Sequence, residues 1–293
     1  MRGFRVWALR AAAVLGVLVV LGVPAARASQ STAGQSTTGQ SGVGQSGVGQ
    51  GGVGQGGVGA AVGVSPAAAF QRGMEYFIGR GVARDDALAF RWVRRAAMAG
   101  YAEAQTQLGF MYRHGLGVAR DDRAAFAWAR RAAAAGNAAG MNNLGNLYLT
   151  GVGTARDATR AVALFRQAIA AGYAPARVSL GWAYFNGLGV ARDCTKAVAL
   201  YRQGIADDDP GAENNLAVAY FEGCGVPRDN SKALRWLLIA RRRAAARPTE
   251  VAPSDLARID SNIVNLEARM SPAAIARARD AAAGWRPPAK DGN

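Results

Sequence analysis

The sequence contains only one histidine, His114, and only two cysteines, Cys194 and Cys224. A zinc site usually takes three or four His or Cys ligands, so most zinc sites are excluded. Acidic residues are also few: the chain has 20 aspartates and glutamates but 35 lysines and arginines, which gives a net charge of +15. Because half of the 293 residues are hydrophobic, a wholly disordered chain is excluded, and the length predicts one or two domains.

The N-terminal apolar run is too short for a membrane span, which needs roughly 20 residues. Three arginines within the first ten residues precede the uncharged run 11–23, and the motif Ala-Arg-Ala follows at 26–28. This order predicts a signal peptide over 1–28, cleaved after Ala28, and a periplasmic or secreted protein. An uncleaved N-terminal anchor is the alternative. Cleavage would remove four arginines and no acid, lowering the net charge from +15 to +11.

Residues 29–64 hold a low-complexity segment in which a glycine recurs every five residues from Gly34 to Gly59. Chains rich in glycine and serine have almost nothing to bury and behave as flexible coils. We therefore expect a disordered leader here. A short adhesive or wall-associated repeat is the alternative.

An internal repeat dominates the rest of the chain. Five loops carry a Gly-x-Gly pair, with a tyrosine three residues before the first glycine and an aspartate six after it; these first glycines are Gly79, Gly115, Gly151, Gly187 and Gly223. The interval is always 36 residues, and a period of this size predicts a solenoid. In the second unit, Ala104, Leu108 and Tyr112 lie on one face of a first helix, and Asp121 caps a second. Because one such helix pair cannot bury its own apolar face, we expect five to stack in an all-α fold.

The pattern A-x3-LG-x2-Y-x2-G-x-GV-x2-D-x2-KA-x2-W-x3-AA-x2-G resembles the Sel1-like repeat family. The resemblance implies a right-handed α-solenoid of about five 36-residue helix-turn-helix repeats over 65–247. The departures from the pattern are Arg72 for Leu, Leu164 and Leu200 for Trp, Ala217 for Gly, and the segment Asp207-Asp208-Asp209-Pro210, which lacks the usual Gly. That segment is the expected irregularity in the stack.

Two further helical stretches follow the repeats. One begins near Ser254-Asp255, and the other opens with the cap pair Ser271-Pro272 and ends near Trp285. We expect 248–286 to form a C-terminal cap, which a solenoid needs for solubility, and 287–293 to be a disordered tail. Many exported Sel1-like proteins carry a similar tail.

The sequence offers few candidate catalytic residues. His114 is alone in its position among the repeats, and the repeated aspartates are better explained as helix caps than as paired acids. There is no phosphate-binding loop and no dinucleotide motif. We therefore predict no catalytic residues, no metal and no cofactor. A hydrolase acting on cell-wall material or β-lactams is the competing hypothesis, since some cysteine-rich relatives have been linked to penicillin binding.

Cys194 opens the second helix of the fourth unit, and Cys224 lies in the loop of the fifth. Corresponding points of adjacent repeats are about 10 Å apart, a gap that the offset between these two positions can close. Export to an oxidising compartment favours a disulfide, with two free thiols as the alternative. The resemblance does not supply this pairing, because the cysteine-rich relatives place their bridges elsewhere.

The resemblance also implies where a partner binds, because first helices line the concave face of such stacks. Carried over to this chain, the groove residues are Phe77, Phe110, Arg113, Asn142, Asn146, Trp182, Phe185, Asn214 and Phe221. Aromatic anchors beside Asn and Arg suit a peptide groove. The alternative for each aromatic is packing between neighbouring repeats.

Arginines form two further rows. One precedes the capping aspartates (Arg84, Arg120, Arg156, Arg192, Arg228), and the other lies on the second helices (Arg94, Arg130, Arg166, Arg202). Such rows suit an anionic polymer or headgroup, with a solvated face as the alternative. Nucleic acid is not expected, because export removes the protein from the cytoplasm.

Exported Sel1-like proteins resembling this one act as adaptors in envelope assembly, polysaccharide export and periplasmic control of signalling. The sequence therefore predicts a non-enzymatic scaffold with a protein or peptide partner in the cell envelope and no transmembrane span in the mature chain. A polyanion binder is the alternative among non-enzymes.

Overall fold

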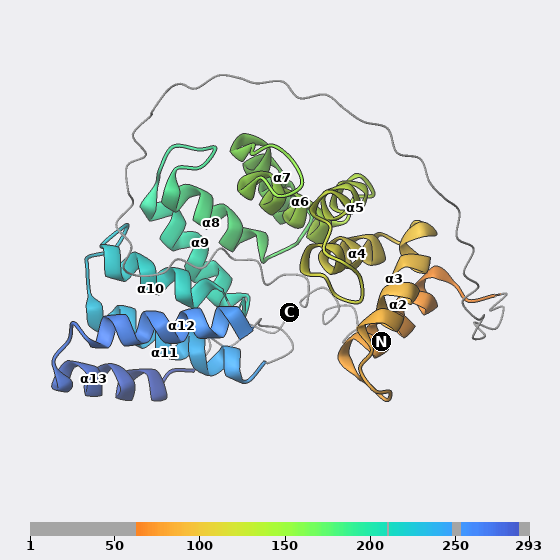
Figure 1. Ribbon diagram of the computed structural model, residues 1–293. Helices are drawn as coiled ribbons and strands as arrows, with labels where there is room; N and C mark the ends of the chain where they lie inside the picture. The colour runs from red at the N-terminus through yellow and green to blue at the C-terminus, as the bar shows by residue number, and fades with distance from the viewer. Residues whose placement is uncertain (1–62, 210, 248–252, 287–293) are drawn as a thin grey trace, which may run out of the picture. The chain divides into compact units, whose positions relative to one another are not determined.

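The computed structural model describes residues 63–209, 211–247 and 253–286, which form helices and no strand (Figure 1). The predicted signal peptide, the leader up to residue 62 and the tail 287–293 lie outside these residues. The helices are α2 (Pro66–Ile78), α3 (Asp86–Met98), α4 (Ala102–His114), α5 (Asp122–Ala134), α6 (Ala138–Thr150), α7 (Ala158–Ala170), α8 (Ala176–Asn186), α9 (Cys194–Ala206), α10 (Ala212–Glu222), α11 (Asn230–Ala245), α12 (Pro253–Glu267) and α13 (Pro272–Ala283).

Each of the five repeats is a pair of helices, from α2 with α3 to α10 with α11. The even-numbered first helices of the repeats end on a glycine in the left-handed conformation, such as Gly115 with φ 67°. An aspartate then caps the second helix: Asp121 Oδ1 accepts a hydrogen bond from Ala124 N at 2.9 Å. The same cap recurs at Asp85, Asp157, Asp193 and Asp229. These local features confirm the helix-turn-helix unit predicted from the sequence.

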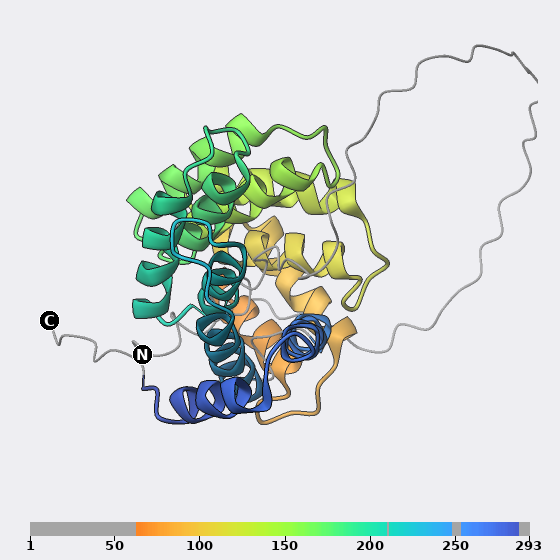
Figure 2. The same ribbon diagram turned by 90° about the vertical axis from the view of Figure 1, so that its left-hand side faces the viewer.

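The helix pairs stack in chain order, as a solenoid requires (Figures 1 and 2). Each helix from α2 to α11 packs against the next one, and α4 also contacts α6. Gly109 allows α4 to approach α5 closely, since a Cβ atom there would lie 3.2 Å from the carbonyl oxygen of Ala125. The buried faces of neighbouring repeats thus join into a core that no single pair could form.

The predicted irregularity between the fourth and fifth repeats is present. Asp208 takes the position that Gly100, Gly136 and Gly172 hold in the first three repeats, and it adopts the same left-handed conformation, with φ 70°. An L-residue with a Cβ pays roughly 1–2 kcal/mol for this conformation. The Asp208 carboxylate is held there by ion pairs with Arg243 and Arg247 of the fifth repeat's second helix and the turn after it. Distant arginines therefore stabilise a turn that glycine makes elsewhere without help.

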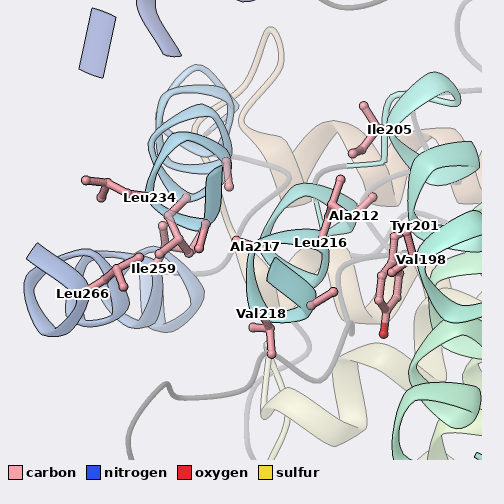
Figure 3. Packing of buried hydrophobic residues seen from close by; sticks show 14 of the residues in the cluster. Val198, Tyr201, Ile205, Ala212, Leu216, Ala217, Val218, Leu234, Ile259 and Leu266 are labelled. Atoms are coloured by element: carbon pink, nitrogen blue, oxygen red, sulfur yellow. The ribbon is translucent and has the colours of Figure 1, made fainter. Parts of the chain in front are cut away.

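The last two helices close the C-terminal end of the stack. Figure 3 shows Ile259 and Leu266 of α12 in the same apolar cluster as Leu234 of α11 and Leu216 of α10. The indole of Trp285, just after α13, meets that of Trp236 edge-on at a centroid distance of 5.9 Å. Ser271 accepts a hydrogen bond from Ala274 N and caps α13, with Pro272 in the first turn. These contacts give the C-terminal helices the capping position expected for them.

Candidate binding surfaces

The first helices present the predicted groove residues in two states of burial. Five side chains are half-buried and keep part of their surface accessible: Phe77, Phe110, Arg113, Trp182 and Phe221. Four are buried: Asn142, Asn146, Phe185 and Asn214. Only the first group is available for direct contact with a partner in this conformation.

A small pocket brings two of the predicted residues together. Phe110 and Arg113 of α4 line it with Ala129 of α5, and Asn143 and Leu147 of α6 lie on its other side. Partial burial lowers the pKa of the Arg113 guanidinium, although Asp122 opposes this effect. The pocket therefore combines an aromatic ring, a cation and an amide in one hollow.

His114 lies directly beside this pocket, with its ring centroid 4.4 Å from that of Phe110. Burial is the main cause that lowers the pKa of the imidazole, and the positive charges of Arg113 and Arg120 add to it. The imidazole is tilted by 39° against the Phe110 ring and remains exposed to solvent. Among the described residues, no cluster of three or more His, Cys, Asp or Glu side chains is arranged to hold a metal ion.

Trp182 and Phe185 form an aromatic pair on α8. Their rings are nearly parallel, at an interplanar angle of 9° and a centroid distance of 6.3 Å. Phe185 is only 3% exposed and also contacts Tyr201 of α9, so it packs between helices and supports the ring of Trp182. Trp182 is the member of the pair that a partner can reach.

Three of the predicted aromatics share a contact that the sequence analysis missed. In each case the arginine seven residues later in the same repeat lies over the ring: Arg84 over Phe77, Arg192 over Phe185 and Arg228 over Phe221. The recurring Phe-x6-Arg spacing is a sequence signal that could have revealed it. Three arginines of the loop row are therefore engaged with first-helix aromatics of their own repeats.

Buried amides form a second feature that the sequence analysis found only in part. Several amide atoms on the first helices are buried and have no hydrogen-bond partner among the described residues: Gln105 Oε1, Gln107 Nε2, Asn142 Oδ1, Asn143 Oδ1, Asn146 Nδ2, Asn215 Oδ1 and both amide atoms of Asn214. The groove pattern predicted Asn142, Asn146 and Asn214 and missed the others. A polar residue before the core leucine, as in Gln107 and Asn143, was the available signal. Leaving a buried amide without a hydrogen-bond partner costs about 1–3 kcal/mol. Because these atoms are buried, a partner cannot contact them in this conformation.

The structure joins Cys194 to Cys224 in a disulfide, with the two Cα atoms 5.2 Å apart. This is the pairing that the repeat positions favoured. Arg192 extends across the bridge: its Nε donates to the carbonyl oxygen of Phe185 at 2.9 Å, and its Nη2 lies 3.4 Å from Cys224 Sγ. The disulfide and Arg192 together connect the fourth repeat to the loop of the fifth.

The sequence matches the family described as Sel1 repeat at five consecutive segments: 66–101, 102–137, 138–173, 174–209 and 210–243. The chain belongs to the Sel1 repeat family. The five matches coincide with the five helix pairs of the structure, and Sel1 repeat proteins are generally protein-interaction scaffolds.

Two solved structures are similar to this Sel1 repeat chain. One is a Sel1 repeat protein from Oxalobacter formigenes, with 32% identity and a TM-score of 0.48, over 62% of this chain and 73% of that one. The other is c5321, a protective antigen present in uropathogenic Escherichia coli strains, with 24% identity and a TM-score of 0.28, over 78% of this chain and 66% of that one. A search of curated proteins found no match. No helix in the described part of the chain is long and apolar enough to span a membrane.

Proposed function

We propose that this Sel1 repeat protein is a non-enzymatic scaffold of the cell envelope that binds a protein or peptide partner on its first helices. The observation that carries the proposal is the pocket between α4, α5 and α6. There, the half-buried side chains of Phe110 and Arg113 lie side by side and keep part of their surface accessible.

These two side chains suit contact with the surface of a bound peptide. The aromatic ring offers apolar contact, and the guanidinium can pair with a carboxylate. Two repeats further along, Trp182 offers a second aromatic contact above the buried Phe185. Truncating an aromatic residue in a well-packed binding site to alanine often costs 2 kcal/mol or more of binding free energy.

The envelope location rests on the predicted signal peptide, and the disulfide supports it, because disulfides persist in oxidising compartments. Envelope assembly, polysaccharide export and periplasmic control of signalling are the processes that the family resemblance suggests.

The experiment has two stages. A photo-crosslinking residue placed at Phe110 should capture a partner in the native host, whereas the same residue at Trp128, a half-buried position on the second helix α5, should not. The Kd for the identified partner is then measured with Phe110→Ala and Trp182→Ala together. We expect binding to weaken at least tenfold, about 1.4 kcal/mol, with helical content unchanged.

Trp128→Ala is the control for the Trp182→Ala change, because it removes the same side chain from a second helix, and it should change the Kd less than twofold. Equal losses for the two variants, or a partner captured only through Trp128, would show that the first helices are not the binding surface.

A further inference from the structure

Charge is unevenly divided between the two kinds of helix. The second helices of the five repeats contain 15 basic and two acidic residues, whereas the first helices contain three basic and four acidic residues. Both acids of the second helices, Asp86 and Asp122, lie at the first helical position. Beyond the first turn, α3, α5, α7 and α9 therefore present basic and neutral side chains only.

One row runs across these four helices at a single repeat position: Arg94, Arg130, Arg166 and Arg202, all exposed. Arg91 of α3 and Arg123 of α5 are exposed beside it. Within the described ranges, no carboxylate pairs with any of the four, and their polar contact with the protein is the one from Arg166 Nη2 to the hydroxyl of Tyr184 at 3.2 Å. We call these four residues the outer arginine row.

Two of the loop arginines differ from the outer arginine row. Arg84 binds both carboxylate oxygens of Asp86 through Nε and Nη2, and Arg120 binds Asp122 in the same way. Bidentate pairing of this kind already uses the fork geometry of the guanidinium. The guanidinium groups of the outer arginine row keep that geometry available for a ligand. The sequence alone could not distinguish the two rows in this respect.

We propose that the outer arginine row binds a linear anionic polysaccharide that carries carboxylates along its length. Guanidinium groups pair with carboxylates in a planar, bidentate arrangement, and the row repeats once per helix pair. A polymer lying across the second helices would meet one arginine per repeat. This surface is independent of the first-helix partner site.

The spacing and the composition of the surface favour such a polymer over two other polyanions. A nucleic acid strand carries a charge about every 3.4 Å, which is much denser than one arginine per repeat. Proteins that lie on a membrane insert apolar side chains below the headgroups. Among the described residues, the large hydrophobic side chains that are well exposed are Met98 and Val264, which lie apart on α3 and α12.

The test measures binding of the full chain to fluorescent hyaluronate oligosaccharides, which carry one carboxylate per disaccharide, with neutral dextran as the blank. The variant Arg94→Gln, Arg130→Gln, Arg166→Gln, Arg202→Gln should bind at least tenfold more weakly. A control with the same loss of charge, Arg84→Gln, Arg120→Gln, Arg277→Gln, Arg279→Gln, should stay within twofold of the original chain. Circular dichroism checks that both variants keep their helices.

Other outcomes overturn the proposal. Unchanged hyaluronate binding by the variant of the outer arginine row would show that this row does not bind the polymer. Equal loss in both variants would indicate a general effect of net charge. Tighter binding to random-sequence DNA of similar length, or row-dependent binding to phosphatidylglycerol vesicles without hyaluronate binding, would assign the row to a different ligand. Trp182→Ala should leave hyaluronate binding unchanged, so failure here is distinguishable from failure of the first-helix site.

Discussion

The backbone carbonyl of Cys194 occupies the space in which a Cβ atom on Gly225 would lie. Gly225 is the second glycine of the fifth loop, and Cys194 is the first helical residue of the preceding repeat's second helix. The same relationship recurs in the three loops before it. A Cβ atom on the second glycine of each loop would overlap the backbone carbonyl of the first helical residue in the preceding repeat's second helix: Gly117 with Asp86, Gly153 with Asp122 and Gly189 with Ala158. Each loop thus sits directly on the previous repeat, which explains how Cys224, beside Gly225, comes within bonding distance of Cys194.

We predict that Gly117→Ala destabilises the stack more than Gly136→Ala does. Both glycines have positive φ, 67° and 78°, so both substitutions carry a conformational cost of about 1–2 kcal/mol. A Cβ at Gly136 would meet nothing within 4 Å, whereas one at Gly117 would overlap the backbone of Asp86. Overpacking typically adds roughly 1–3 kcal/mol, so Gly117→Ala should lose that much more in the free energy of unfolding.

Urea unfolding followed by circular dichroism measures both Gly→Ala variants. If they lose the same stability, the second glycine of each loop is required only for its backbone conformation and not for contact between repeats.

We predict that the Cys194–Cys224 bridge forms in the protein isolated from its native host. Thiol labelling in denaturant should find no reactive cysteine before reduction and two after it. The bridge closes a 30-residue separation, for which chain entropy predicts a stabilisation of about 3–4 kcal/mol. The double variant Cys194→Ser, Cys224→Ser should therefore unfold at a lower urea concentration than the oxidised protein and at about the same concentration as the reduced one. Two labelled thiols before reduction would contradict the prediction.

We predict that the mature chain begins at Ser29. The basic start, the short apolar run and the Ala-Arg-Ala motif of the sequence support this cleavage site, which lies outside the described residues. Intact-mass measurement of the protein from its native host should give the mass of residues 29–293. A mass that retains 1–28 would instead support the N-terminal anchor.

The period of 36 residues made the order of helices and loops predictable, because the signals involved act within a few residues of one another. Gly115 ends a helix through its own positive φ, and Asp121 caps the next helix three residues ahead of the N–H that it binds. The groove prediction was less complete. It found Phe110, Arg113 and Trp182 at accessible positions but could not show that Phe185 packs against Tyr201, since that contact depends on the angle between α8 and α9.

The sequence by itself determined the five helix pairs, their turns and the family, because each of these depends on local backbone preference repeated at a fixed interval. Only the tertiary structure decided how Asp208 is held in a left-handed turn, because Arg243 and Arg247 approach it from the second helix of the fifth repeat and the turn after it. It also decided which amides remain unpaired and which arginines remain free, because such pairing depends on side chains that meet only after the repeats have stacked.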